Sequence, residues 1–126
     1  MCDQSEIRRN EEVDMNKPTC SCFTPGAMRS WTDRADIGVS SGYWDVSTIR
    51  CGKCGTLWLQ GNFEISAYSR SGRFYRTPVT ETELEAITPD AGISLLKSAA
   101  LRIAGGSLWD GVEHVSVGPG ELQEWP

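Results

Sequence analysis

The chain has 126 residues, of which 39% are hydrophobic and 23% are charged, proportions that are ordinary for a soluble globular protein. Its formal net charge of -5 argues against a general nucleic-acid binder, because contacts to phosphate dominate that kind of affinity. No apolar run is long enough for a membrane span or for the core of a signal peptide. We therefore expect a cytoplasmic protein that has no membrane partner.

The chain divides into a polar tail and one domain. Residues 1–17 lack hydrophobic periodicity and are predicted to form a flexible N-terminal tail. Residues 18–126 suit a single domain with a modest core, which a bound metal would help to stabilise. Charge is uneven within this domain: residues 18–79 carry seven basic and four acidic side chains, whereas residues 80–126 carry two basic and eight acidic ones. The domain is thus expected to end in an acidic C-terminal tail.

The first part of the domain is predicted to be an antiparallel sheet of three to four strands. Residues 19–42 are rich in Ser, Gly, Asp and Arg and are expected to form a loop. Strands are indicated by β-branched and aromatic residues, by alternation and by a Gly-containing turn at 70–73; they are expected at 43–50, 56–60, 63–69 and 74–79.

Two helices are predicted after the sheet. Thr80 and Glu83 have the spacing of a capping box, which indicates that a helix begins there. Thr88 precedes a proline, as at the start of a second helix, and apolar residues continue at helical spacing as far as Ile103. One more short strand is expected at 113–117. The predicted fold class is therefore α+β, with the sheet first and two helices after it.

Two close pairs of cysteines carry the strongest chemical signal. Cys20 and Cys22 form a C-x-C pair, and 28 residues separate it from a C-x2-C pair formed by Cys51 and Cys54. Four thiolates in two pairs are the ligand set of a tetrahedral zinc site, and cysteine clusters in a reducing compartment indicate metal or catalysis more often than disulfides. Gly55 would let the chain turn back toward the sulfurs. We predict one structural Zn²⁺ held by these four cysteines.

Other interpretations of the cysteines are open. A redox C-x2-C pair normally precedes a helix, whereas a strand is predicted here, and the four residues could also be ordinary core or surface cysteines. Cys2 lies in the tail and is expected to be free. His114 could replace one thiolate. Because four thiolates close the coordination shell, and no zinc-protease or phosphate-loop motif is present, we expect no enzyme activity.

Charged residues suggest two binding surfaces, each with a plainer alternative. Basic and aromatic side chains around one hairpin could stack on bases and bind phosphate, as in a zinc-ribbon nucleic-acid-binding or transcription-associated module: Tyr68, Arg70, Arg73, Tyr75 and Arg76. The aromatic residues could equally form the core of the sheet. Glu81, Glu83 and Glu85, together with the acidic C-terminal tail, could dock a basic protein, or the acidic C-terminal half could be no more than a solvated face.

The runs "CGKCGTLW" and "SRSGRFYR" resemble a set of small bacterial proteins with a zinc ribbon, a Ser-Gly-Arg-aromatic hairpin and two helices. That set comprises immunity proteins of contact-dependent inhibition and related polymorphic toxin systems, and the resemblance covers roughly residues 43–104. The resemblance implies a zinc-ribbon-like sheet with one structural zinc. The ligands that it implies most directly are Cys51 and Cys54, and Cys20 and Cys22 would complete the set. It also implies a function: binding and neutralising a cognate toxin, such as a basic nuclease.

Overall fold

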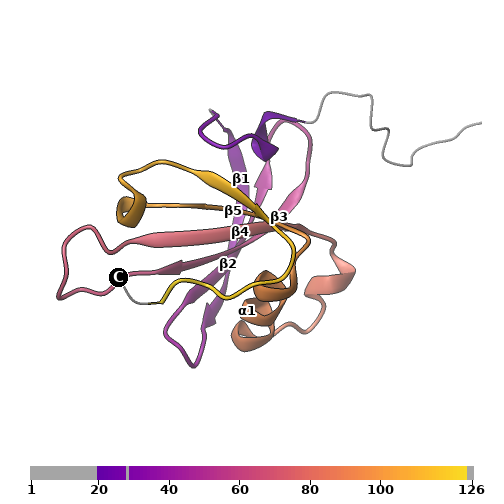
Figure 1. The fold of residues 1–126 in the computed structure, drawn as a ribbon. Coiled ribbons are helices and arrows are strands. Elements are labelled where there is room, and N and C mark those ends of the chain that lie inside the picture. Colours follow the sequence, from indigo (N-terminus) through magenta and orange to yellow (C-terminus); the bar gives the residue numbers. More distant parts are fainter. Residues whose placement is uncertain (1–19, 28, 125–126) are drawn as a thin grey trace, which may run out of the picture.

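One six-stranded antiparallel sheet forms the centre of the computed structural model, which describes residues 20–27 and 29–124 (Figure 1). The strands lie side by side in chain order: β1 (Trp31–Val39), β2 (Asp45–Cys51), β3 (Leu57–Phe63), β4 (Arg73–Val79), β5 (Leu101–Gly105) and β6 (His114–Val117). The tail predicted at residues 1–17 lies outside the described residues. No helix within the described ranges is long and apolar enough to cross a membrane.

The expected fold class is wrong in both its strand count and its helix count. In place of three to four strands followed by two helices, the described residues form a mostly β structure with one α-helix, α1 (Pro89–Ser98), between β4 and β5. Three single 3₁₀ turns complete the described part: η1 (Ser21–Phe23), η2 (Thr82–Leu84) and η3 (Ser107–Trp109). The strands predicted at 43–50, 56–60, 74–79 and 113–117 correspond to β2, β3, β4 and β6.

Strand β1 occupies residues that the sequence predicts as a loop. It lies at the edge of the sheet with most of its side chains exposed, so its sequence lacks the apolar–polar alternation of a half-buried strand. The pairing with β2 also shifts register between Thr32 and Ala35 and again between Asp36 and Gly38. Such bulges add residues to one strand and disturb the two-residue period further.

The strand predicted at 63–69 is mostly a loop. Only its first residue belongs to β3, and the rest connects β3 to β4. The hydroxyl of Ser71 accepts a hydrogen bond from the Ile65 N–H at 2.9 Å and donates one to the Ile65 carbonyl at 2.8 Å. Both backbone groups of Ile65 are thereby satisfied by a side chain, which closes the loop and replaces a strand ladder.

The first predicted helix stops after a single turn. Its capping box forms, because Glu83 N–H donates to Thr80 Oγ1 at 3.2 Å and Thr80 N–H donates to Glu83 Oε1 at 2.9 Å. Ala86 then takes a positive φ of 53°, and Thr88 is extended, as residues before a proline usually are. The helical conformation therefore cannot continue past η2.

The second predicted helix begins as expected but ends early. The side chain of Thr88 caps α1, and Pro89 occupies its first position. Ala99 is already extended, and the chain then enters β5. Ile103 and Ala104 are both completely buried on this strand, although successive strand residues point to opposite faces. A strand buried on both faces has no polar alternation, so its apolar run also fits a helical period.

The two faces of the sheet carry different cores. On one face α1 packs against the strands, and the buried residues of this cluster are Trp44, Val46, Leu59, Tyr75, Ile93, Leu96, Ala104 and Leu122. The opposite face, here called the second face, has its own cluster: Cys22, Ile49, Cys51, Trp58 and Ile103. Two of the four predicted zinc ligands, Cys22 and Cys51, thus belong to a hydrophobic core. Burying a Leu or Ile side chain in such a core contributes about 1.5–3 kcal/mol to stability.

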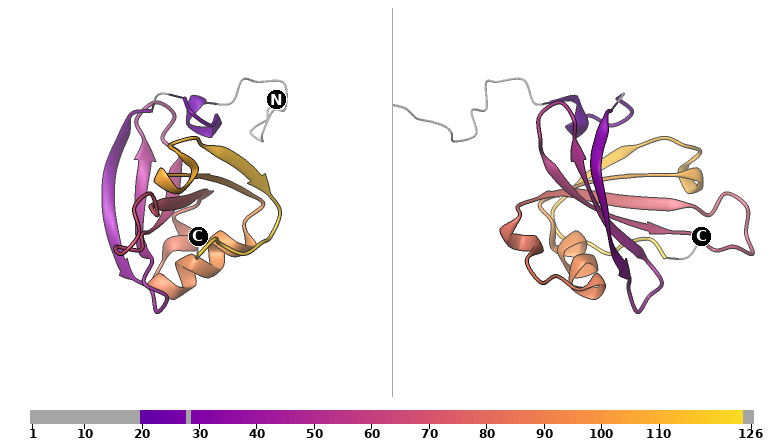
Figure 2. Two further views of the ribbon diagram at one scale, coloured as in Figure 1. Left: turned by 60° about the vertical axis from the view of Figure 1, so that its left-hand side comes forward. Right: turned by 180° about the vertical axis from the view of Figure 1, so that it is seen from behind.

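The sheet curves around its second face. Figure 2 shows β1 rising on one side and the β5–β6 hairpin on the other, with η1 at the end where the β2–β3 hairpin turns. Across this curve the loop before β1 meets the residue before β6, because Arg29 Nη1 lies 2.8 Å from Glu113 Oε1. The curvature thus brings the first cysteine pair, Cys20 and Cys22, onto the hydrophobic core of the second face, to which Cys51 of the other pair belongs.

Candidate metal centre

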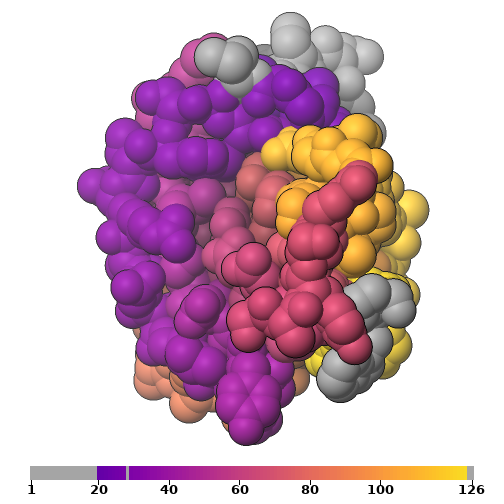
Figure 3. All heavy atoms as spheres, turned by 90° about the vertical axis from the view of Figure 1, so that its left-hand side faces the viewer, coloured from indigo at the N-terminus to yellow at the C-terminus, as the bar shows by residue number. Residues whose placement is uncertain are grey.

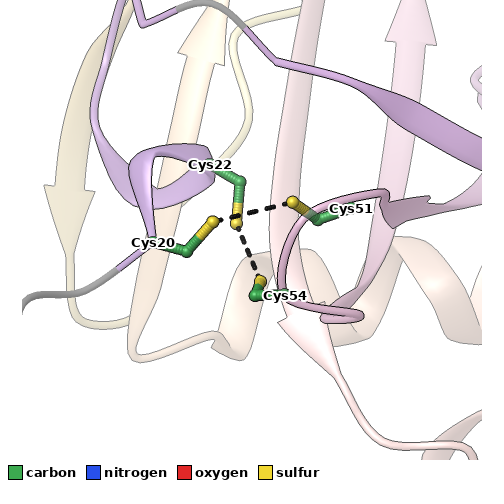
Figure 4. A group of neighbouring side chains, drawn as sticks. All are labelled: Cys20, Cys22, Cys51 and Cys54. Atoms are coloured by element: carbon green, nitrogen blue, oxygen red, sulfur yellow. Dashed lines mark hydrogen bonds between the residues drawn. The ribbon is translucent and has the colours of Figure 1, made fainter.

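The four predicted cysteines converge at one point (Figure 4). The sulfur atoms of Cys20, Cys22, Cys51 and Cys54 all lie within 4.8 Å of one another. Cys20 Sγ is 3.7 Å from Cys51 Sγ, and Cys22 Sγ is 3.7 Å from Cys54 Sγ. Four sulfurs at about 2.3 Å from a tetrahedral zinc ion would be about 3.8 Å apart. The spacing therefore fits a bound metal, and all four cysteines are free thiols.

The second pair sits in the turn of the β2–β3 hairpin. Cys51 ends β2, and its carbonyl accepts a hydrogen bond from the Gly55 N–H at 2.9 Å. Gly55 has a φ of +80°, a conformation that glycine adopts without strain. The backbone N–H of Lys53 points back at Cys51 Sγ from 3.4 Å. The turn predicted between these two strands is therefore present, and it brings Cys51 and Cys54 into the cysteine cluster.

The first pair is held by a 3₁₀ turn. Phe23 N–H donates to the Cys20 carbonyl at 3.0 Å, which closes η1 and turns both sulfurs toward the other pair. Cys22 is completely buried, and the Phe23 ring packs 4.9 Å from the ring of Trp58. Since the C-x-C pair lies in a helical turn and only the C-x2-C pair lies in a hairpin, the centre is not made of two matching ribbon knuckles.

A buried indole tests whether the site suits a metal thiolate. The Trp58 Nε1–H group is buried without a hydrogen-bond partner among the described residues, yet it acts on Cys22 to lower the pKa of that thiol. Buried donors are rarely left unpaired, and a metal-bound thiolate is a better acceptor than a neutral thiol. The Trp58 donor is thus placed for a negatively charged sulfur, as metal binding would supply.

The thiols differ in how readily they ionise. Burial raises the pKa of Cys22 well above the ordinary value, and contact with Cys54 raises it further. Burial also acts to raise the pKa of Cys51, but the backbone N–H groups of Cys54 and Lys53 outweigh it and bring the pKa to about 6. Cys51 is therefore prepared to be a thiolate, whereas Cys22 needs a cation beside it to ionise.

A buried ion network fixes the first cysteine pair to the sheet. Arg29 donates through Nε to the Cys22 carbonyl at 3.2 Å and through Nη2 to the Thr24 carbonyl at 2.6 Å. Its Nη1 pairs with Glu113, whose second oxygen lies 3.7 Å from Arg76 Nη2. We call these three side chains the Arg29–Glu113–Arg76 network. The exposed fraction is 6% for the Arg29 side chain, 15% for that of Glu113 and 6% for that of Arg76.

The charge of this network complements a tetrathiolate. Two guanidinium groups and one carboxylate leave one positive charge, whereas zinc with four thiolates carries two negative charges. Burial and the nearby Arg29 lower the pKa of Arg76 to about 10, so Arg76 stays charged at neutral pH, and Cys22 acts in the opposite direction to raise it. This network is not predicted from the sequence, because its members are far apart along the chain and follow no motif.

The other candidate residues lie elsewhere. His114 is exposed on β6 and packs against the Trp109 ring at 4.8 Å, so it takes no part in the cysteine cluster. Cys2 is outside the described residues.

The basic and aromatic hairpin does not form one exposed platform. Arg73 and Arg76 are 2% and 5% exposed, and Tyr75 is buried as well. Only Tyr68 and Arg70 are exposed, and Arg70 forms an ion pair with Asp110. The phosphate-binding surface that the nucleic-acid interpretation needs is therefore not assembled by these residues.

No family model, curated protein or solved structure matches the chain.

Proposed function

We propose that the chain holds one structural Zn²⁺ between Cys20, Cys22, Cys51 and Cys54. The observation that carries this proposal is the convergence of four free thiols within 4.8 Å. Soft thiolates in a tetrahedral set select zinc over hard cations, and four protein ligands leave no open position for a substrate. The role is therefore structural: zinc joins the loop before β1 to the β2–β3 hairpin.

Elemental analysis of protein purified without chelator tests the metal. We expect one zinc per chain in the wild-type protein and a loss of zinc in Cys22→Ser, with Cys2→Ser as the matched control that keeps it. A folded wild-type protein without metal would refute the proposal. One iron per chain in place of zinc would refute the choice of metal and keep the four-thiolate site.

We also propose that the protein acts by binding, as a cytoplasmic immunity protein that neutralises a basic toxin such as a nuclease. What supports an acidic docking surface is a hollow of about 540 Å³ on the outer side of α1 and η2. Its lining combines carboxylates with apolar side chains: Glu83, Glu85, Ala86, Ile87, Ala91, Ser94, Leu95 and Ser98. An apolar floor beside acidic residues suits a protein segment that carries both apolar and basic side chains.

The acids of this surface are not equivalent. Glu81 pairs with Arg50 at 3.1 Å, and Glu83 is occupied in the capping box of η2. The carboxylate of Glu85 is exposed and has no ion pair or side-chain hydrogen bond within the described part of the chain. Glu85 is therefore the acid most available to a basic partner, and its substitution leaves the local fold intact.

The immunity proposal is tested by protection of growth. Cells that express a cognate basic toxin should survive when they also express the wild-type protein. Glu85→Lys should slow association with the purified toxin several-fold at low salt, whereas Glu64→Lys, which changes another exposed acid on the β3–β4 loop, should not. Absence of protection would contradict the immunity proposal, and equal association rates for both variants would remove the acidic surface from it.

A further inference from the structure

The second face of the sheet carries a groove that lies outside the four-cysteine cluster and the acidic surface, and its floor includes Arg76 of the Arg29–Glu113–Arg76 network. Three hollows of about 460, 380 and 370 Å³ lie along it. The first and second share Asp45 and Asn62, and the second and third share Arg34, so the three hollows adjoin one another; together they are called the groove. Figure 3 looks onto this side of the molecule, with indigo β1 on one side and the orange and yellow C-terminal part on the other. Each hollow has the size of a small-molecule site.

A row of buried polar side chains crosses the floor of the groove. Ser47 on β2 pairs with Gln60 on β3, and Gln60 pairs with Arg76 on β4. Side chains directly opposite each other on neighbouring strands share a face, so all three point to the second face. They are 2%, 9% and 5% exposed. Burying polar side chains in the middle of a sheet is unfavourable unless their donors and acceptors are paired.

Two atoms of this row have no partner. Arg76 donates through Nε to Gln60 Oε1 at 3.1 Å, and its Nη2 lies 3.7 Å from Glu113 Oε2. Arg76 Nη1 and Ser47 Oγ are buried and make no hydrogen bond within the described ranges. Most buried donors in folded proteins are paired, so two orphans in one row indicate a missing acceptor.

One acceptor could serve both atoms. Ser47 and Arg76 are two strands apart, about 9–10 Å between backbones, and the Arg76 side chain leans toward β3 to reach Gln60. An anion lying over Gln60 would therefore lie between the Arg76 guanidinium and the Ser47 hydroxyl. A guanidinium matches the two oxygens of a carboxylate or phosphate, and exclusion of water strengthens such a contact.

Aromatic rings stand beside the unpaired guanidinium. The Arg76 Cζ atom lies 4.3 Å from the Phe74 ring centroid and 5.1 Å from the Trp31 ring centroid. Trp31 is only half-buried on an edge strand, and the bulge that follows Thr32 includes Asp33 with a φ of +53°. Bulges occur often beside binding sites, and here the Trp31 ring lines the third hollow together with Arg76.

We propose that this groove binds a small organic oxyanion, a carboxylate or phosphate ester with a flat apolar group. The oxyanion lies on Arg76 Nη1 and Ser47 Oγ, and the flat group lies against Trp31 and Phe74. The unpaired buried donors supply the charge and the hydrogen bonds, and the rings supply a surface for stacking. The proposal stands on this groove alone and does not depend on the immunity proposal.

Titration with benzoate and with phenyl phosphate, each at constant ionic strength, tests the site in the zinc-loaded protein. We expect saturable NMR shifts of the Trp31 indole and of the backbone amides of Ser47 and Gln60, with no such shifts from sodium chloride. Arg76→Gln should weaken binding by about ten-fold or more. Arg70→Gln, an arginine exposed on the β3–β4 loop, is the matched control and should bind as the wild type does.

A second variant covers a loss of folding in Arg76→Gln. Ser47→Ala removes a hydroxyl that has no hydrogen-bond partner within the described ranges, so it should fold normally and bind about three- to ten-fold more weakly. Binding of either probe that depends on Ser47 supports the site, and the tighter probe identifies the anion. Absence of saturable shifts with both probes, or wild-type affinity in Ser47→Ala, would overturn the proposal.

Discussion

Removing the charge of Glu113 should destabilise the fold far more than removing an acid from the surface. In Glu113→Gln the shape is kept, but Arg29 loses its 2.8 Å ion pair and Arg76 loses the carboxylate that it faces at 3.7 Å. Breaking a buried pair costs about 3–5 kcal/mol, and the partial exposure of Glu113 reduces this to about 2–4 kcal/mol. For a domain of this size that corresponds to a fall in Tm of about 10–20 °C.

Urea unfolding of the zinc-loaded protein, followed by circular dichroism, measures this loss. The matched control is Glu121→Gln, whose side chain is 88% exposed and pairs with Lys97 at 3.4 Å. A surface pair of this kind is worth about 0–1 kcal/mol. If Glu113→Gln lost no more stability than Glu121→Gln, the network would not be holding the loop before β1, and the reasoning would be refuted.

Further predictions concern pH, the backbone and the helix cap. Burial tends to raise the pKa of Glu113, but the Gly26 N–H and Arg29 lower it overall, so its stabilisation is present above about pH 4.5 and is lost as pH falls through the lowered value. The stability gap between wild type and Glu113→Gln should therefore narrow progressively as pH falls below about 4.5, and a constant gap would contradict the assignment. Gly106→Ala should cost at least about 2 kcal/mol in urea unfolding, because φ is +119° and a Cβ would lie 2.5 Å from the Gly72 carbonyl oxygen; Gly111→Ala, also at positive φ but in open space, should cost about 1 kcal/mol. Thr88→Ala should cost about 1 kcal/mol by removing the cap of α1, and an unchanged unfolding midpoint would show that the cap contributes nothing.

The metal centre was the most predictable part of the molecule. The C-x2-C pair with Gly55 is a local pattern, because three residues and one turn conformation position two sulfurs. The convergence of Cys20 and Cys22 on that turn could be expected only from the chemistry of four thiolates. The structure places all four together, while the presence of a bound metal and its identity are proposals.

The fold was less predictable, for reasons visible in particular strands. β1 is exposed and bulged, and β5 is buried on both faces, so neither shows the alternation by which a strand is found in a sequence. The capping box at Thr80 was identified correctly, but a cap does not fix the length of the helix that it starts. The Arg29–Glu113 pair joins distant parts of the chain and leaves no local signal.

X-ray absorption at the zinc edge tests the central claim most directly. We expect a single zinc environment of four sulfur ligands at about 2.3 Å, reduced or lost in Cys22→Ser. A spectrum dominated by nitrogen or oxygen ligands, or a folded protein that holds no zinc, would contradict the assignment of Cys20, Cys22, Cys51 and Cys54 as one structural metal centre.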